Sequence, residues 1–406
     1  MNRVVVDEEA QKPQDNTSGT IGMISSPLIA ADTDFKMPSN TLISWMNGLL
    51  FGGQVIGGFL FGYVADRLAS LVSLSISFCS TSLIFLALQL PLGIALGGHL
   101  SYDVIFFLEF TPSSKIKDLN PLIMLFGITG IMGKLIIEPY GWRNYMLAYS
   151  ILSGCIFLLR ILLFRFESPR YLLSKSKHNK VVKVINTMSR DCLLQDDCTI
   201  YVKQNKEVKK SKIMFKDVKV FFPLALQWFL VTLSYYGLIL FIPTYLMKRR
   251  VEMAGVYDFY IVLAVSEIPG LVLTRLFLTK ASYSTTLAAN TFGCALSCLG
   301  LIFAKETNLI FFFNSLIYFF IIGCWTVLYT WTPTLIDVTK RGRIMSMISF
   351  IAKCAGILAA PFSSFLWSTF GNNADNHVSC AIVLGIFTVL FGAATVNGSL
   401  LRYNVK

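Results

Sequence analysis

Five ionisable side chains lie inside long apolar segments of this sequence, where their chemistry points to a function. Lys353 lies within SFIAKCAGILAAPF, Glu267 and Arg275 share one apolar run, and Asp103 and Lys134 lie in two earlier runs. A charged side chain at the centre of a membrane costs roughly 2.5–3.5 kcal/mol, so such residues usually face a partner or a water-filled cavity. These five residues are therefore candidates for binding a charged solute or an ion.

Lys353 is the first candidate. A lysine midway along a helix that faces other helices could bind a carboxylate or take part in a proton step, and the alternative role is a structural pair with a nearby acid. Asp103 could be its counter-charge or a protonation site. Lys134 and Arg275 lie near the ends of their apolar runs, where snorkelling to the interface explains them more simply.

Glu267 comes just before Pro269 and Gly270, where we expect a helix to kink. Its carboxyl could serve in gating or ion binding, or it could form a structural pair. A separate small-residue pattern, GLLFGGQVIGGFLFG over residues 48–62, is typical of a seam where two helices approach closely.

The elements that must position these residues are membrane helices. The chain has 406 residues, 54% of them hydrophobic, and a mean hydropathy of +0.63, which exceeds ordinary soluble usage. A helical span needs about 20 apolar residues. Such segments predict eleven spans, at 42–65, 70–90, 91–110, 120–138, 145–164, 220–247, 256–278, 284–304, 308–331, 344–367 and 378–401. The prediction is an all-α polytopic membrane protein.

Several function classes are disfavoured by the same sequence. The net charge of +12 is concentrated in one Lys- and Arg-rich segment between Arg170 and Lys219, which favours a cytoplasmic loop near anionic lipid over a nucleic-acid site. The nine cysteines and three histidines show no metal-ligand spacing. We find no nucleophile–base constellation and no nucleotide motif, so we predict no enzyme, no cofactor, no metal and no nucleic-acid partner.

The basic segment sets the predicted organisation. A polar tail covers residues 1–18, an N-terminal helical bundle 19–165, a basic cytoplasmic loop 166–219, a C-terminal bundle 220–401 and a short tail 402–406. In this topology Asp66 and Arg67 form an inner-face joint between spans. Lys248, Arg249 and Arg250 fall outside, against the positive-inside bias. Two bundles about a long loop are typical of parallel repeats in transporters.

Six short motifs, in their order and spacing, resemble the major facilitator superfamily, and within it the synaptic-vesicle-2-related and organic ion transporter branch. The resemblance covers residues 20 to 400. The motifs are GYVADR (62–67), GWRNY (141–145), ESPRYLL (167–173), SYYGL (234–238), SEIPG (266–270) and TWTPT (330–334). The resemblance implies a fold of two six-helix bundles, of which the first helix is present here only as its second half.

The resemblance also implies roles for particular residues. In the family, the Asp of the inner-loop motif latches one bundle to a helix end of the other, so Asp66, with Arg67, is expected to be a conformational latch rather than a mere solvated turn. The branch often places Arg where this chain has Lys353, and in organic-anion relatives that cation helps to hold substrate. Ala69, Ser70 and Leu71 depart from the Gly-Arg-Arg/Lys that usually follows the motif.

The sequence thus predicts a secondary transporter of a small organic solute, organic ions included, working by alternating access with a proton as the coupling ion. Lys353, Asp103 and Glu267 are the expected solute- or ion-binding residues. The expected location is the plasma membrane or an intracellular vesicle membrane. The alternative is a non-transporting membrane protein of the same fold that acts as a receptor or trafficking partner.

Overall fold

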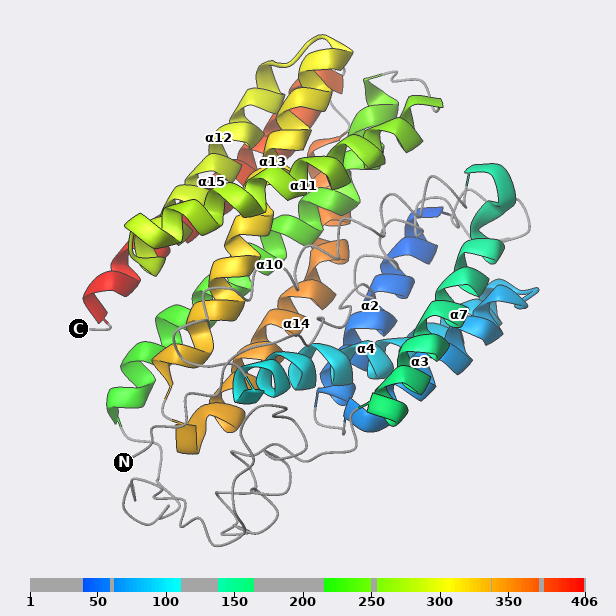
Figure 1. Ribbon diagram of the computed structural model, residues 1–406. Coiled ribbons are helices and arrows are strands. Elements are labelled where there is room, and N and C mark those ends of the chain that lie inside the picture. Colours follow the sequence, from blue (N-terminus) through cyan, green and yellow to red (C-terminus); the bar gives the residue numbers. More distant parts are fainter. Residues whose placement is uncertain are drawn as a thin grey trace, which may run out of the picture.

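The computed structural model describes residues 39–58, 62–110, 138–163, 215–249, 254–336, 338–371 and 376–404, and the regular elements among them are helices (Figure 1). These are α2 (Ser39–Gly57), α3 (Gly62–Ser77), α4 (Ser82–Phe110), α7 (Glu138–Leu163), α10 (Phe215–Lys248), α11 (Ala254–Lys280), α12 (Tyr283–Phe303), α13 (Thr307–Trp331), η3 (Thr332–Leu335), α14 (Val338–Phe370) and α15 (Asn376–Asn404). The predicted spans from residue 220 onward coincide with α10 to α15. The predicted span 120–138 and the incomplete first helix lie largely or wholly outside the described residues.

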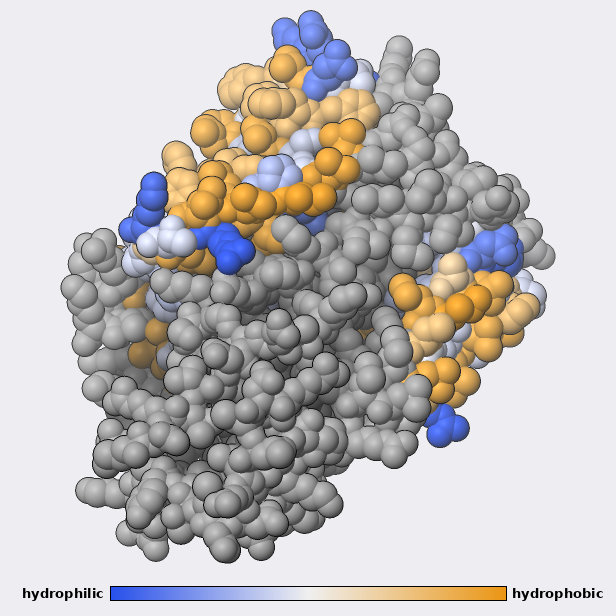
Figure 2. All heavy atoms as spheres, viewed as in Figure 1, coloured by the Kyte–Doolittle hydropathy of each residue, from blue (hydrophilic) through white to orange (hydrophobic). Residues whose placement is uncertain are grey.

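Five of the described helices carry a segment long and apolar enough to cross a bilayer. The outer surface is apolar as well: Figure 2 shows hydrophobic side chains gathered over α11 and α12. Leu276 of α11 and Phe292, Leu296 and Phe303 of α12 are all more than half exposed. In water this surface would be a liability, whereas in a bilayer it faces lipid tails. The chain is an integral membrane protein with several spans.

The boundaries predicted for the early spans were wrong. The span predicted at 42–65 ends at Gly57, and α3 covers residues 62–77. The spans predicted at 70–90 and 91–110 are replaced by a break after Ser77 and by one helix, α4, which continues through Pro91. The break has a local cause, because Thr81 caps α4: its Oγ1 accepts a hydrogen bond from the Ile84 nitrogen at 3.4 Å. Apolar length alone does not register such a cap.

The predicted joint at Asp66 and Arg67 is also corrected. The two residues are the fifth and sixth of α3 and so lie inside a helix, after the interval between α2 and α3. Arg67 is exposed, and the side chain of Asp66 lies outside the described part of the structure. The pair therefore sits one turn into a helix and does not occupy the connection itself.

The glycine seam predicted in residues 48–62 is confirmed where α2 meets α4. A Cβ atom at Gly53 or Gly57 would collide with the α4 backbone at Leu90 to Ile94. α4 contributes glycines to the same contact, because a Cβ atom at Gly93 or Gly97 would collide with the backbone of α2. Two four-residue glycine repeats thus face each other and bring the helix backbones into contact.

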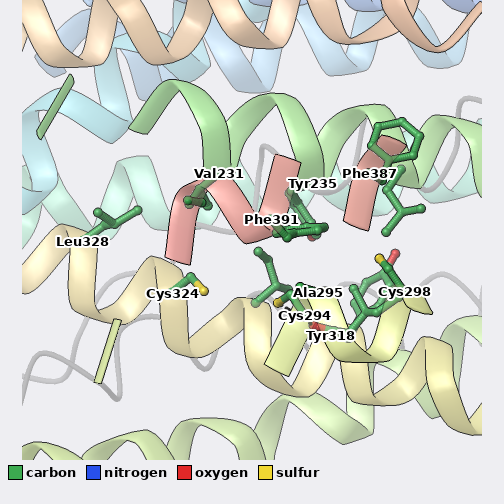
Figure 3. Packing of buried hydrophobic residues seen from close by; sticks show 14 of the residues in the cluster. Val231, Tyr235, Cys294, Ala295, Cys298, Tyr318, Cys324, Leu328, Phe387 and Phe391 are labelled. Carbon is green, nitrogen blue, oxygen red and sulfur yellow. Dashed lines mark hydrogen bonds between the residues drawn. The ribbon is translucent and has the colours of Figure 1, made fainter. Parts of the chain in front are cut away.

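The helices after residue 215 pack through side chains. Val231 and Tyr235 of α10, Cys294 and Cys298 of α12, Tyr318 and Leu328 of α13, and Phe387 and Phe391 of α15 share one buried cluster (Figure 3). α14 packs against α10 on one side and against α2 and α4 on the other. It therefore connects the helices after residue 215 with those before residue 111.

The cations predicted on the outer side, Lys248 and Arg249, have a structural role at the end of α10. Arg249 donates a hydrogen bond to the carbonyl of Ala304, which ends α12, and a cation there complements the helix dipole. Lys248 Nζ lies 5.6 Å from the centre of the Trp367 ring of α14. These contacts tie the ends of α10, α12 and α14 together, while Arg250 lies outside the described residues.

Candidate functional site

A cavity lies where α2 meets α10, α13 and α14, between the two groups of helices. Its volume is about 70 Å³, measured as the space open to the centre of a water molecule. The lining residues are Phe51, Gln54, Trp228, Thr232, Tyr236, Trp325, Tyr329, Met345, Ser346, Ile348, Ser349, Ala352 and Lys353. Interfaces between helical repeats are where transporters of this architecture place their solute sites.

One wall of this cavity is aromatic. The Trp228 ring meets Tyr329 at a centroid distance of 4.9 Å, nearly perpendicular, and Trp325 at 5.9 Å. Tyr236 lies 6.3 Å from Trp325. Trp228 is fixed in place, because its Nε1 donates a hydrogen bond of 3.0 Å to Thr332 Oγ1 in η3. The four rings form a preordered surface on which a flat solute can stack.

A second part of the lining comes from α2. Phe51 meets the Tyr236 ring edge to face at 5.0 Å, and Gln54, one turn further along α2, is buried beside it. The Phe51 ring fits over Gly356 of α14, where an added Cβ atom would run into it. The amide of Gln54 supplies both a donor and an acceptor to the cavity.

Lys353 supplies the positive charge. Its side chain is only 6% exposed and lines the cavity from α14, on the face that also carries Ser346 and Ser349. Among the described residues, neither a hydrogen bond nor a salt bridge holds its ammonium group. A buried cation is costly unless it is paired, so a bound anion would supply the missing partner.

Glu267 lies outside this lining. It is 9% exposed and sits in α11, beside Tyr235 of α10, with which it interacts electrostatically. The structure therefore does not bring Glu267 and Lys353 into one described ion pair. Arg275 is exposed, two turns further along α11. Asp103 belongs to α4, but its side chain and the whole of Lys134 lie outside the described residues.

Sequence reasoning found part of this site. It singled out Lys353 as the first candidate for binding a charged solute, and Lys353 lines the cavity. It missed Phe51, Gln54, Thr232, Tyr329 and the two serines. The serines had a signal, because Ser346, Ser349 and Lys353 recur every three to four residues and so share one helix face. Gln54 also had a signal in the sequence, because it is the polar residue inside the glycine seam.

Comparisons with known proteins place this geometry in a family. A model of the Major Facilitator Superfamily matches residues 16–361. The putative niacin/nicotinamide transporter NiaP of Bacillus subtilis (strain 168) is 23% identical over 387 residues, covering 91% of this chain and 88% of that protein. Synaptic vesicle glycoprotein 2C of Mus musculus is 29% identical over 186 residues, which are 39% of this chain and 25% of that protein.

A solved structure agrees over the whole fold. The proton:xylose symporter XylE, bound to 6-bromo-6-deoxy-D-glucose, superposes with a TM-score of 0.71 at 15% sequence identity, covering 96% of this chain and 92% of that one. The predicted fold and the predicted resemblance are therefore confirmed.

Proposed function

We propose a function for this chain, which belongs to the major facilitator superfamily and is not an enzyme: it is a secondary transporter that moves a small organic anion by alternating access. The observation that carries the proposal is the cavity between the two groups of helices, where Lys353 is buried, has no partner in the described part of the chain, and shares the lining with an aromatic wall. Such a site offers a charge for an anionic group and a stacking surface for a ring.

The solute class we propose is a planar aromatic monocarboxylate. The carboxylate would contact Lys353, the ring would stack against Trp228, Trp325 and Tyr329, and Gln54 would meet a ring heteroatom. This chemistry agrees with the similarity to the putative niacin/nicotinamide transporter NiaP, because niacin is a pyridine carboxylate. It also separates niacin from nicotinamide, whose neutral amide gains nothing from a cation. Nicotinate is therefore our test solute.

The position of the cavity supports alternating access. The cavity is built by α2 from one group of helices and by α10, α13 and α14 from the other, so a relative movement of the two groups would open and close it. We keep Asp66 and Arg67, at the start of α3, as the proposed latch of that movement. A latch acts on turnover rate and not on solute affinity.

The coupling ion we propose is a proton. A monocarboxylate carried with one proton crosses without net charge, so a pH gradient drives its accumulation and the membrane potential does not. XylE, which has the same fold, is a proton:xylose symporter. Asp103 and Glu267 are the proposed acids, and Glu267 is the one whose surroundings the structure describes.

The experiment that tests the function is counterflow of labelled nicotinate in proteoliposomes that contain wild-type protein or Lys353→Ala. Hydrogen bonds to a charged group contribute about 1.5–3 kcal/mol, so removing the ammonium is expected to raise the half-saturating concentration roughly 10- to 100-fold. Lys353→Arg, which keeps a cation, should retain part of the affinity. Lys280→Ala, at the exposed end of α11, is the matched control and should behave as wild type.

Competition in the same vesicles defines the solute class. Benzoate should inhibit, whereas nicotinamide and xylose should not. Wild-type vesicles without counterflow of nicotinate or benzoate above the protein-free background would contradict the proposed transport, and equal inhibition by nicotinamide would contradict the role of Lys353 as an anion contact.

A receptor or trafficking role without transport is the second candidate. The observation that favours it is the departure at Ala69, Ser70 and Leu71: instead of a basic turn, Ser70 exchanges two hydrogen bonds with Ser150 of α7, at 3.0 and 2.8 Å. The match to synaptic vesicle glycoprotein 2C agrees with such a role, but covers a quarter of that protein. Thermal stabilisation by nicotinate without counterflow in the same preparation would select this candidate.

A further inference from the structure

We infer that Glu267, behind the aromatic wall of the cavity, is the site at which the transported proton binds. This inference rests on the proposed function, because it assigns the coupling ion of that same transport to one residue. It adds a second site outside the solute cavity. Tyr235 lies beside Glu267 at this site, and its ring contacts the aromatic wall of the cavity.

Glu267 occupies the inner face of a helix whose outer face is apolar. Its neighbours Val265, Ile268 and Val272 are 46–48% exposed on the lipid side, whereas Glu267 points inward and is 9% exposed. Inside the described part of the protein, no hydrogen bond or salt bridge holds its carboxyl group. Glu267 is thus a buried acid whose carboxyl group has no partner among the described residues. The stability of the fold alone does not explain such an arrangement.

Among the described residues, the titratable group that the structure places beside Glu267 is Tyr235 of α10, which is neutral. Around Tyr235 itself lie Tyr318 of α13, at a centroid distance of 6.2 Å, and Cys294 of α12 (Figure 3). The nearest cation along α11 is Arg275, eight residues further on. Because burial removes water from around the carboxyl of Glu267, its charge is costly unless a proton removes it or the surroundings open. A proton is therefore the natural ligand of this acid.

Tyr235 connects this acid to the solute cavity. Its ring lies 5.0 Å from Tyr236 and 5.9 Å from Trp325, centroid to centroid, and both of those residues line the cavity. A solute that moves either ring also changes the contacts of Tyr235, and so the surroundings of Glu267. By linkage, a proton on Glu267 then changes solute affinity by the same factor as solute changes proton affinity.

The backbone around Glu267 allows such a change. Pro269 has no backbone N–H, so the Val265 carbonyl loses its usual helical partner. One residue later, Gly270 lies so close to α13 that an added Cβ atom would collide with the Phe319 carbonyl. α11 is thus weakened in its own hydrogen bonding and pressed against α13 at the turn that follows the acid.

The test is accumulation of labelled nicotinate in proteoliposomes with an inwardly directed proton gradient, compared with counterflow at equal pH. Coupling to one proton predicts about tenfold accumulation per unit of pH difference for wild type. Glu267→Gln, which keeps the size but cannot release a proton, is expected to lose accumulation on the gradient, so that its uptake with a pH difference equals its own uptake at equal pH. Glu306→Gln, an exposed acid at the start of α13, is the matched control and should accumulate as wild type.

The outcomes separate this inference from the proposed function. Wild-type vesicles that show no counterflow would overturn the transport itself. Wild-type counterflow without accumulation on a proton gradient, or accumulation by Glu267→Gln equal to wild type, would overturn the proton site alone.

If Glu267→Gln does not fold, the inference is tested with Glu267→Asp and with a pH-sensitive dye trapped inside the vesicles. Solute entry must then acidify the lumen in wild type, and the external pH that gives half-maximal uptake must differ between the Asp variant and wild type. An unchanged pH profile would overturn the inference.

Discussion

The contact between α2 and α4 and the contact between α10 and α13 are built in opposite ways. The first is backbone on backbone: facing glycines leave no side chain between the helices. The second is ring on ring, with tryptophans and tyrosines that also form the wall of a cavity. The difference shows that α2 and α4 form a close-packed support that presents Phe51 and Gln54, whereas α10 and α13 contribute the rings on which the proposed solute would stack.

The largest effect is expected from filling the glycine contact. Gly53→Ala places a Cβ atom against the backbone of α4 at Leu90 and Gly93, and because backbone cannot rotate away, we expect a loss on the order of 3 kcal/mol and poor recovery of folded protein. Gly52→Ala, the adjacent residue of α2, has no heavy atom within 4 Å of the added carbon. It should be neutral or slightly stabilising, since Ala favours helix over Gly. Thermal melts in detergent measure both, and equal melting temperatures would contradict the support role.

An intermediate effect is expected from removing one ring of the aromatic wall. Trp325→Leu removes the ring that meets Trp228, Tyr235 and Tyr236, and the loss of stacking should weaken nicotinate about tenfold, since aromatic contacts contribute about 0.5–1.5 kcal/mol each. Phe312→Leu, on the exposed face of the same helix, is the control. Half-saturating concentrations from counterflow distinguish them, and an unchanged value for Trp325→Leu would show that the wall only packs.

The smallest effect is expected at the hydroxyl pair that joins α3 and α7. Ser70→Ala removes one donor from the reciprocal pair with Ser150, at a cost of about 1 kcal/mol. Each hydroxyl donates to the backbone carbonyl of the other residue, which an alanine keeps, so Ser150→Ala should cost a similar amount and the two effects should add within about 0.5 kcal/mol in the double variant. Ser75→Ala, whose exposed hydroxyl bonds within α3 to the Leu71 carbonyl, is the comparison and should cost less than either, as measured by thermal melts in detergent.

The fold was largely predictable from sequence, and the site only in part. Spans after residue 220 are long apolar runs separated by polar turns, and such runs specify helices by length alone. The break at Ser77–Thr81 was missed because a single Thr cap makes it inside an apolar stretch, and α4 was divided because Pro91 reads as a stop although neighbouring helices support the chain there.

The site shows a different limit of sequence reasoning. Lys353 stood out because a lysine in an apolar run is rare, so its type alone carried a signal. Phe51 carried none, because a phenylalanine beside glycines looks like packing, and its importance comes from α14 lying opposite. Partnerships between residues about 300 positions apart depend on how helices are placed together, and periodicity within one helix cannot reveal them.

The fit of Phe51 over Gly356 has a consequence for inheritance and selection. The smallest side chain of α14 at this contact sets how closely the two groups of helices can approach, and it does so three residues from Lys353 without lining the cavity. Under the proposed transport, a single nucleotide change that converts this glycine to a larger residue would leave the cavity lining intact and still shift the balance between open and closed forms. On that proposal, transport speed evolves separately from solute choice, through a position that does not line the cavity.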